Sequence, residues 1–439
     1  MAGTAGMREA LSWARESFVA AGLSEVRLEP VPMPLRWQEG DTSVAVISPV
    51  EFSVRAMSSA LSPPVPGELV GELADGGSGE PGAISRRAGD LAGRVALVRL
   101  DEAVSFDDLA VEQRDAMVAI GEAADSGALA VLFVSTRPHG LLYRHVNNVA
   151  GRIDPIPSAV VAREDGLRLL RRVRLDESVR VRIRMPNRIG PAYETANVVA
   201  EIPGEGQSDE IVLLGAHLDS WDVGTGCLDN AVNAALVVHV ARALVQVRAR
   251  PRRTIRFVLF GGEEFGLFGS RAYVDSHRSE LGRHVATIVH DMGDGPLVGY
   301  SVGGRDELLP ALAQVLRPLE GAGEYRHTTD PFFLSDNLTF MLQGVPSLFA
   351  VQDTSEFAPT YHSEADTYDK VRIDRVTGTA LVAAWTALGI ADLEARFGKR
   401  WSQRRVMGWL NRAGMVRHLR FLGVWDSWRP RALPRAGEE

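Results

Sequence analysis

The chain from residue 210 to residue 393 alternates short β-rich runs with helical segments, and this alternation restricts the fold more than any other feature. Runs rich in β-branched residues predict strands, and apolar residues recurring every three or four positions predict helices. Alternating strands and helices build sheets that helices cover on both faces. We therefore expect an α/β fold with a mixed, mostly parallel sheet flanked by helices. The expected strands are 210–215, 253–260, 286–291 and 346–350, and the expected helices are 230–247, 267–277, 306–318 and 374–393.

The first 182 residues follow a different pattern. Residues 7–21 read as a helix, and stretches rich in proline and glycine at 62–68 and 74–82 mark a boundary. After that boundary, short β-rich runs are separated by helical stretches at 111–126 and 164–173. The expected parts of the chain are an N-terminal piece of the main domain (1–56), an inserted domain (57–182), the rest of the main domain (183–395) and a basic extension rich in tryptophan and arginine (396–439).

The composition excludes several classes of protein. With 439 residues, 45% of them hydrophobic, the chain can bury more than one core. A net charge of −8 argues against a nucleic-acid-binding protein, which would carry a basic balance. Cys227 is the only cysteine, so no internal disulfide can form. No run approaches the length of a transmembrane helix and residues 1–30 lack a signal-peptide pattern, so we expect a soluble protein whose location stays open, extracytoplasmic if its start is truncated.

Charged and imidazole side chains follow the expected strands at the points where the strands end. Ligands of open α/β sheets bind just beyond the carboxyl ends of the strands, so we expect these side chains to share one cleft. Carboxylates and imidazoles without thiolate clusters suit zinc or a similar divalent metal. So many acids would repel one another unless cations neutralised them. The residues are His217, Asp219, Asp229, Glu263, Glu264, Asp291 and His362.

Four stretches resemble, in order, the motifs of the co-catalytic two-zinc aminopeptidase family: HLDSWDVGTGCLDN, GGEEFGLFGS, HDMGDG and YHSEADT. The form HLDSWDVGTG is similar to that of the carboxypeptidase Q (plasma glutamate carboxypeptidase) branch. One such motif alone is weak, but an ordered set across residues 183–393 is specific. The resemblance implies the zinc exopeptidase fold with a small β-rich protease-associated domain inserted at 57–182. That insert is expected to shape access to the site and to perform no chemistry.

The resemblance also implies two Zn²⁺ ions per chain, held by five residues. His217 and Asp291 would complete one zinc site. Glu264 and His362 would complete the other, and Asp229 would bridge both metals. Two metals about 3.5–4 Å apart can hold a bridging water and polarise the scissile carbonyl together.

Three further residues take roles around the metals by the same resemblance. Glu263 would be the general base that takes the water proton and passes it to the leaving amine. Asp219 would accept the imidazole N–H of His217 and fix its tautomer. Asp336 is a candidate for holding a charged substrate terminus, because the family has an acidic residue in a similar position. The alternative for Asp336 is a cap of a helix at 337–343.

Taken alone, these residues have simpler interpretations. Glu263 and Glu264 are typical of the solvated first turn of a helix. His362 fits an ordinary surface loop, and Asp291 fits a turn cap. Jointly, these interpretations do not explain why every position that the family uses for metal carries a residue able to bind one. Cys227 could supply a thiolate, although a small reduced residue beside the site is the simpler expectation. The other histidines of this region are expected to be ordinary: His239, His277, His284 and His290.

The expected function is a zinc-dependent exopeptidase of the aminopeptidase or dipeptidase type that hydrolyses short peptides. The sequence does not separate aminopeptidase, dipeptidase and carboxypeptidase activity. Two alternatives are a glutaminyl-cyclase-like acyltransferase with one zinc and a non-catalytic binding homologue. His217 argues against the first, because a one-metal enzyme does not need it, and the full ligand set argues against the second.

The C-terminal extension carries Trp401, Trp409, Trp425 and Trp428 among many arginines. Such a segment suits either a helix packed on the main domain or on the second copy in a homodimer, or peripheral contact with an anionic membrane surface. Packing is the favoured interpretation. The family also has one more helix ahead of a segment like MAGTAGMREA, so we expect a truncated or shortened start.

Overall fold

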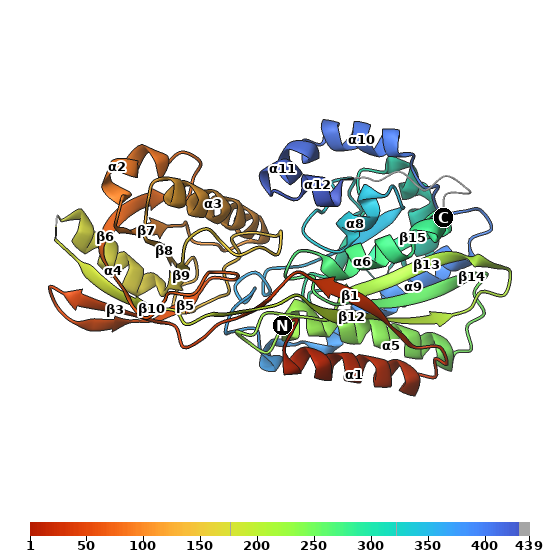
Figure 1. Cartoon of the computed structure of the whole chain (residues 1–439). Helices are drawn as coiled ribbons and strands as arrows, with labels where there is room; N and C mark the ends of the chain where they lie inside the picture. Colours follow the sequence, from red (N-terminus) through yellow and green to blue (C-terminus); the bar gives the residue numbers. More distant parts are fainter. Residues whose placement is uncertain (176, 322, 430–439) are drawn as a thin grey trace.

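The structure is a computed structural model of the chain and describes residues 1–175, 177–321 and 323–429. A main domain, comprising residues 1–35 and 191–429, lies beside an inserted domain (Figure 1). Each domain is built on a mixed sheet with helices against it.

The main sheet has seven strands in the order β1-β12-β14-β13-β15-β17-β16. The pairs β14–β13, β13–β15 and β15–β17 are parallel, and the outer pairs are antiparallel. A mixed sheet flanked by helices is therefore confirmed, with parallel pairing restricted to its four central strands. The strands are β1 (Arg27–Met33), β12 (Tyr193–Ile202), β13 (Gln207–His217), β14 (Arg253–Phe260), β15 (His284–Val289), β16 (Leu297–Ser301) and β17 (Ser347–Gln352).

Helices cover both faces of this sheet (Figure 1). Side chains of a strand point alternately to opposite faces. Val212 and Leu214 of β13 accordingly join the core beneath α1, α5, α7 and α9, and Leu213 joins the core beneath α6 and α8. These helices are α1 (Ala5–Ala20), α5 (Val232–Gln246), α6 (Phe268–Ser276), α7 (Leu309–Leu316), α8 (Asn337–Leu342) and α9 (Ile373–Asp392).

Some elements of the main domain differ from the sequence-based expectation. Strands β1, β12 and β16 extend the sheet beyond the four expected strands. Pro30 and Pro32 obscure the strand pattern of β1, and its position at the sheet edge is where proline is tolerated. Strand β15 ends at Val289, so Asp291 lies in the loop after the strand. The expected helix 306–318 is α7 between two short 3₁₀ turns.

The inserted domain begins earlier in the chain than expected. Its eight-stranded sheet has the order β4-β3-β10-β6-β7-β8-β9-β5, and Val44 and Val46 of β3 pack with Val181 and Ile183 of β10. The expected boundary at residue 57 is therefore wrong, because the first strands of this sheet precede it. The strands are β3 (Ser43–Ser48), β4 (Phe52–Val54), β5 (Ala56–Ser58), β6 (Leu69–Ser78), β7 (Val95–Arg99), β8 (Ala130–Val134), β9 (Ser158–Val161) and β10 (Arg180–Arg184).

Two helices pack on opposite faces of the inserted sheet, which makes the insert an α/β unit. They are α3 (Phe106–Asp125) and α4 (Arg163–Arg174). Helix α3 begins at a capping box in which Ser105 and Asp108 bond each other's backbone N–H groups. The chain enters and leaves the insert through a two-stranded ribbon of β2 (Arg36–Gln38) and β11 (Arg188–Gly190). From here on, residues 43–184 are called the insert domain.

The C-terminal extension packs on the main domain. Its helices α10 (Gln403–Arg412), α11 (Met415–Phe421) and α12 (Trp425–Trp428) share a core with α8 (Figure 1). Three of its tryptophans, Trp401, Trp409 and Trp428, are buried in this core. These tryptophan side chains therefore pack on the main domain of their own chain.

The segment Cys227–Gln246 is apolar and long enough to cross a membrane by length and composition, which the sequence-based reading overlooked. In the structure, 67% of its most apolar window is buried inside the protein. It is therefore the central helix of the main domain packed between sheet and helices.

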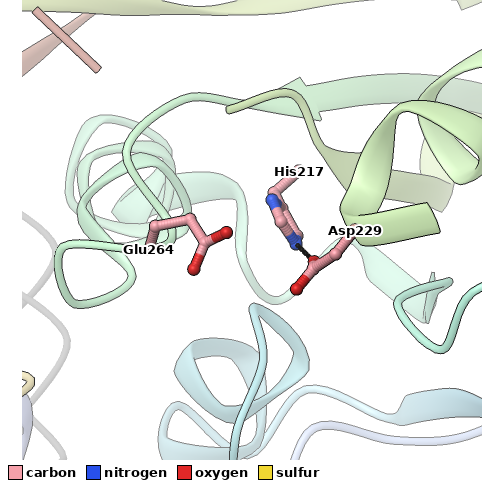
Figure 2. Close-up of side chains that lie close together, drawn as sticks. All are labelled: His217, Asp229 and Glu264. Carbon is pink, nitrogen blue, oxygen red and sulfur yellow. Dashed lines mark ion pairs between the residues drawn. The ribbon is translucent and has the colours of Figure 1, made fainter. Parts of the chain in front are cut away.

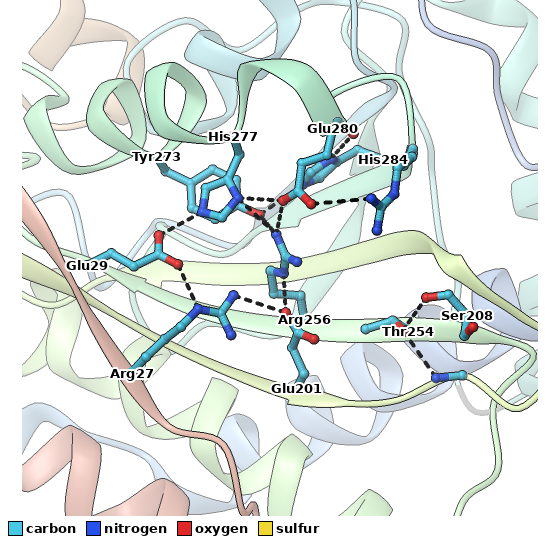
Figure 3. Close-up of polar contacts among 12 residues, drawn as sticks. Arg27, Glu29, Glu201, Ser208, Thr254, Arg256, Tyr273, His277, Glu280 and His284 are labelled. Atoms are coloured by element: carbon cyan, nitrogen blue, oxygen red, sulfur yellow. Dashed lines mark hydrogen bonds and ion pairs between the residues drawn. The ribbon is translucent and has the colours of Figure 1, made fainter.

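A polar network ties the edge strand β1 to helix α6 (Figure 3). Arg256 of β14 lies at its centre, 2.7 Å from Glu201 and 2.6 Å from Glu280. His277 bonds Glu280 and also Glu29 of β1, the latter at 2.8 Å. His277 is thus a structural residue, as the sequence suggested.

Candidate metal centre

Five residues expected to bind metal meet at one edge of the main sheet. His217 is the last residue of β13, and Glu264 follows β14. Asp291 follows β15, and His362 lies in the loop after β17. Asp229 lies in the turn before α5. Because β13, β14, β15 and β17 run parallel, their carboxyl ends bring these separate stretches of chain together.

The five side chains form a continuous chain of contacts, part of which Figure 2 shows. His217 Nε2 lies 2.9 Å from Asp291 Oδ1 and 3.3 Å from Asp229 Oδ1. His362 Nε2 lies 3.0 Å from Glu264 Oε2 and 3.4 Å from Asp229 Oδ2. Asp229 therefore stands between two groups, with one carboxylate oxygen toward each histidine. Ligand atoms of His217, Asp229 and Glu264 all lie within 4.8 Å of one another.

The donors of this cluster fit a divalent metal. Asp229 Oδ2 and Glu264 Oε1 are buried and accept no hydrogen bond from the described residues. Burial, together with the Asp229 carboxylate, raises the pKa of Glu264 well above its ordinary value. Buried carboxylate oxygens without donors are costly unless a cation compensates them. Oxygen and imidazole donors in this number suit zinc.

The two histidines differ in their electrostatic surroundings. Burial alone would lower the pKa of His217, but the Asp291 and Glu263 carboxylates outweigh it and raise that pKa well above its ordinary value. Burial lowers the pKa of His362 to about 4. The imidazole of His362 is therefore neutral near pH 7, which is the form that binds metals.

Asp219 supports the site through both its main chain and its side chain. Its backbone carbonyl, 2.8 Å from His217 Nδ1, accepts the imidazole N–H, whereas its carboxylate Oδ1 lies 4.0 Å from that nitrogen. The carboxylate instead accepts the backbone N–H groups of Gly262 at 2.7 Å and Glu263 at 3.0 Å. Asp219 thus accepts the imidazole N–H as expected, through its backbone carbonyl. Asp219 fixes the histidine through its main chain and the Glu263 segment through its side chain.

Asp366 is a supporting residue that the sequence reasoning missed. Its carboxylate accepts the backbone N–H of Leu228 at 2.6 Å and of Asp229 at 3.1 Å. It therefore holds the turn that presents Asp229. The signal was present, since Asp366 lies four residues after His362 in the stretch YHSEAD.

The insert domain holds the loop that carries His362. The backbone N–H of Arg144 donates to the His362 carbonyl at 2.6 Å, and Tyr143 pairs with Ser363 as an isolated β-bridge. His362 has a φ of 55°, in the left-handed region that residues other than glycine rarely adopt. The insert thus stabilises a backbone conformation that the loop would not favour alone.

The Arg144 side chain connects the insert domain to the loop between His217 and Asp229. Its guanidinium is 2% exposed and donates to Asp222 at 2.9 Å, to Glu39 at 2.8 Å and to the Ser58 carbonyl at 2.7 Å. Asp222 lies between His217 and Asp229 in the sequence. The expectation that the insert only shapes access is therefore too narrow, because residues 143–144 contact two of the loops that carry metal-ligand candidates.

A cavity of about 340 Å³ opens beside the cluster. Glu263, Glu264 and His362 line one end of it, and Glu263 is the more exposed of the two glutamates. Tyr361 also lines it and stacks on the His362 ring with centroids 3.7 Å apart. Asp336 is absent from the lining, has 0% exposure and makes no side-chain cap of α8. Asp336 therefore occupies the N-cap position of α8 without a capping bond from its carboxylate, and its contact with substrate stays a prediction.

Cys227 is separate from the cluster. Its Sγ lies 3.2 Å from Thr225 Oγ1, and it lines a groove between α1, α5 and α9 together with His239. His284 and His290 are buried, and burial lowers the pKa of each to about 3. Within the described part of the chain, none of these side chains makes a hydrogen bond or ion pair with the five cluster residues, which agrees with their expected ordinary roles.

Comparison with known proteins gives one family. A family model described as Peptidase family M28 matches residues 197–386. Carboxypeptidase Q of Bos taurus is 26% identical over 401 residues, which cover 90% of this chain and 82% of that protein. A solved structure of a Peptidase M28 precursor from Shewanella amazonensis SB2B has a TM-score of 0.82 at 24% identity and covers 92% of each chain. BSAP, a zinc aminopeptidase from Bacillus subtilis, has a TM-score of 0.69 at 18% identity over 92% of this chain and 93% of its own. The two structures show that the fold is shared along nearly the whole chain.

Proposed function

We infer that this chain is a member of peptidase family M28, whose model matches residues 197–386, and that it is a zinc-dependent exopeptidase with peptide substrates. The observation that carries this function is the position of Asp229 between two groups of ligand candidates. Neither a glutaminyl-cyclase-like acyltransferase nor a non-catalytic binding protein is favoured, since the family and the relative are peptidases.

Two zinc ions per chain account for the arrangement. His217 and Asp291 would hold one ion, and Glu264 and His362 would hold the other. Asp229, whose oxygens face the two histidines separately, would serve both. Zinc bound there would polarise the scissile carbonyl and lower the pKa of the attacking water.

Glu263 is the proposed general base. It lines the cavity and is partly exposed, whereas Glu264 beside it is 8% exposed and contacts His362. A base must reach the proton that it removes, so the exposed glutamate is the better candidate. Its carboxylate would take the proton of the attacking water and pass it to the leaving nitrogen. The Asp219 carboxylate would keep Glu263 in place through the two backbone N–H groups that it accepts.

The substrates we propose are short peptides with a free terminus. The cavity is confined between the insert domain, the 331–334 loop and the C-terminal helices, which leaves little room for a long chain on both sides of the scissile bond. Cleavage of a panel of free dipeptides, aminoacyl amides and peptides blocked at both ends would show whether the enzyme requires a free amino or a free carboxyl terminus. Efficient cleavage of the doubly blocked peptides would overturn the exopeptidase assignment.

Metal analysis tests the two-zinc proposal. We expect two zinc ions per chain by elemental analysis after zinc loading, and loss of hydrolysis on chelation that zinc reverses. A stoichiometry of one zinc per fully loaded chain would contradict the bridging role of Asp229. A protein that binds no zinc would contradict the enzymatic function.

A further inference from the structure

The cavity beside the metal centre is mainly apolar away from its catalytic end. Phe106 and Met117 of α3 line it from the insert domain, and Phe332 lines it from the loop before α8. Leu422 and Trp428 line it from the C-terminal extension. Three separate parts of the chain therefore surround one apolar space that continues from Glu263 and His362.

The C-terminal wall of this cavity lies outside the part of the chain that the family model matches, since that match ends at residue 386. The wall is nevertheless firmly attached. Trp428 is 6% exposed, and the Arg271 guanidinium lies 5.6 Å from its ring. Arg152 of the insert domain donates to the Gly423 carbonyl at 3.0 Å, which links the insert domain to the C-terminal extension.

The wall also carries little charge. His418 lines the cavity from α11, and burial lowers its pKa below the ordinary value, so the ring is neutral near pH 7. Asp107 and Arg114 of α3 are the charged lining residues among the described residues away from the glutamates. An apolar group entering this space would lose contact with water without burying a charge of the C-terminal wall.

We propose that the C-terminal helices α11 and α12 form a specificity wall of the active site, in a subsite that accepts a large apolar side chain of the peptide substrate. The inference rests on the proposed exopeptidase function, because the subsite is defined by its continuity with the metal centre. Leu422 is the residue that sets the size of the subsite. Its side chain lines the cavity, and it is half-buried.

The substitution Leu422→Trp tests this by filling the cavity instead of emptying the core. The matched control is Phe421→Trp, because Phe421 is the neighbouring residue of α11, is 46% exposed and does not line the cavity. The substrates are Ala-Ala, Leu-Ala, Ala-Leu, Phe-Ala and Ala-Phe. Wild type should prefer the large residue in one of the two positions by about 10- to 200-fold in kcat/KM.

Leu422→Trp should reduce that preference at least about tenfold, because cleavage of the dipeptide with the preferred large residue falls more than cleavage of Ala-Ala, whereas Phe421→Trp should leave the preference unchanged. An unchanged preference in Leu422→Trp, or an equal loss for all five dipeptides with zinc content and Tm retained, would overturn the subsite. Absence of any dipeptide cleavage in zinc-loaded wild type would count against the proposed function instead.

A binding measurement tests the proposed subsite independently of catalysis. Calorimetry with L-phenylalanine and L-alanine as probes should show that wild type and Phe421→Trp bind phenylalanine more tightly. Leu422→Trp should weaken phenylalanine binding at least about tenfold and alanine binding much less. Equal binding of the two amino acids by wild type would overturn the subsite even in an inactive preparation.

Discussion

Replacing Arg144 by methionine should weaken zinc binding although Arg144 is not expected to touch a metal. The guanidinium donates to Glu39 at 2.8 Å, to Asp222 at 2.9 Å and to the Ser58 carbonyl at 2.7 Å. Methionine keeps much of the side-chain volume and removes all three donors. The backbone bond from residue 144 to the His362 carbonyl is retained, so the substitution isolates the contribution of the guanidinium.

The structure sets the size of the effect. Removing one partner of a buried ion pair costs about 3–5 kcal/mol because a charge is left uncompensated. Here the Asp222 and Glu39 side chains are 32% and 16% exposed, so water replaces part of the lost interaction and the low end of that range is expected. Residues that orient metal ligands typically change metal affinity about 10- to 100-fold. We expect a loss of that size, because Asp222 belongs to the loop between His217 and Asp229.

Competition with a chelator measures the zinc affinity, and urea unfolding of the zinc-free protein measures stability. The matched control is Arg163→Met in α4 of the same domain. Arg163 Nη1 donates to the Ser135 carbonyl at 3.0 Å, and its Nε lies 3.5 Å from Glu102. It should lower stability without changing zinc affinity. If Arg144→Met bound zinc as tightly as wild type, the proposed coupling between the insert domain and the metal loops would be refuted.

Three other outcomes can be measured. Glu263→Gln should retain zinc and lower kcat by about 100- to 10,000-fold, because the amide cannot accept the water proton, and near-normal turnover would remove Glu263 as the base. Chelation of wild type should lower Tm as well as activity, since zinc binds only the folded state, and an unchanged Tm would contradict a buried metal centre. Burial alone would lower the pKa of His277, but the bonds to Glu280 and Glu29 outweigh burial and raise that pKa. The stability that this histidine contributes is therefore complete below its unfolded pKa of about 6.5. It is lost as the pH rises through the folded pKa. His277→Gln should therefore destabilise the protein more at pH 6 than at pH 9 in urea unfolding, and an equal loss at both pH values would contradict the pKa shift.

The regular part of the fold could be predicted because it depends on local pattern. The run 253–260 coincides with β14, and the expected helix 374–393 differs from α9 by one residue at each end. The strands without a clear pattern could not be found this way. In β1, alternate proline residues mask the period, and the strand exists because β12 provides a complete row of partners.

The expected metal ligands could be proposed because they lie in loops next to strands and a helix that the sequence reveals, and because the resemblance to the two-zinc aminopeptidase family implies their roles. The structure brings all five together, and their roles as ligands stay predictions. The contacts of the supporting groups were harder to predict from the sequence. The sequence places Asp219 two residues after His217, but which of its oxygens bonds the imidazole depends on the Gly262 and Glu263 amides, which lie more than forty residues away.

The sequence by itself determined the α/β alternation, the chemical types at the strand ends and therefore the class of chemistry. Only the tertiary structure decided that Asp336 is buried, that Arg144 joins the insert domain to two of the loops that carry ligand candidates, and that Leu422 lines the cavity. The physical reason is the separation along the chain between the residues that interact. Strand and helix periods arise from neighbours a few residues apart, whereas Arg144 bonds a carboxylate 78 positions along the chain and a carbonyl on His362. Such contacts follow from how two domains and an extension pack, because packing determines which side chains lose contact with water and which remain at the cavity.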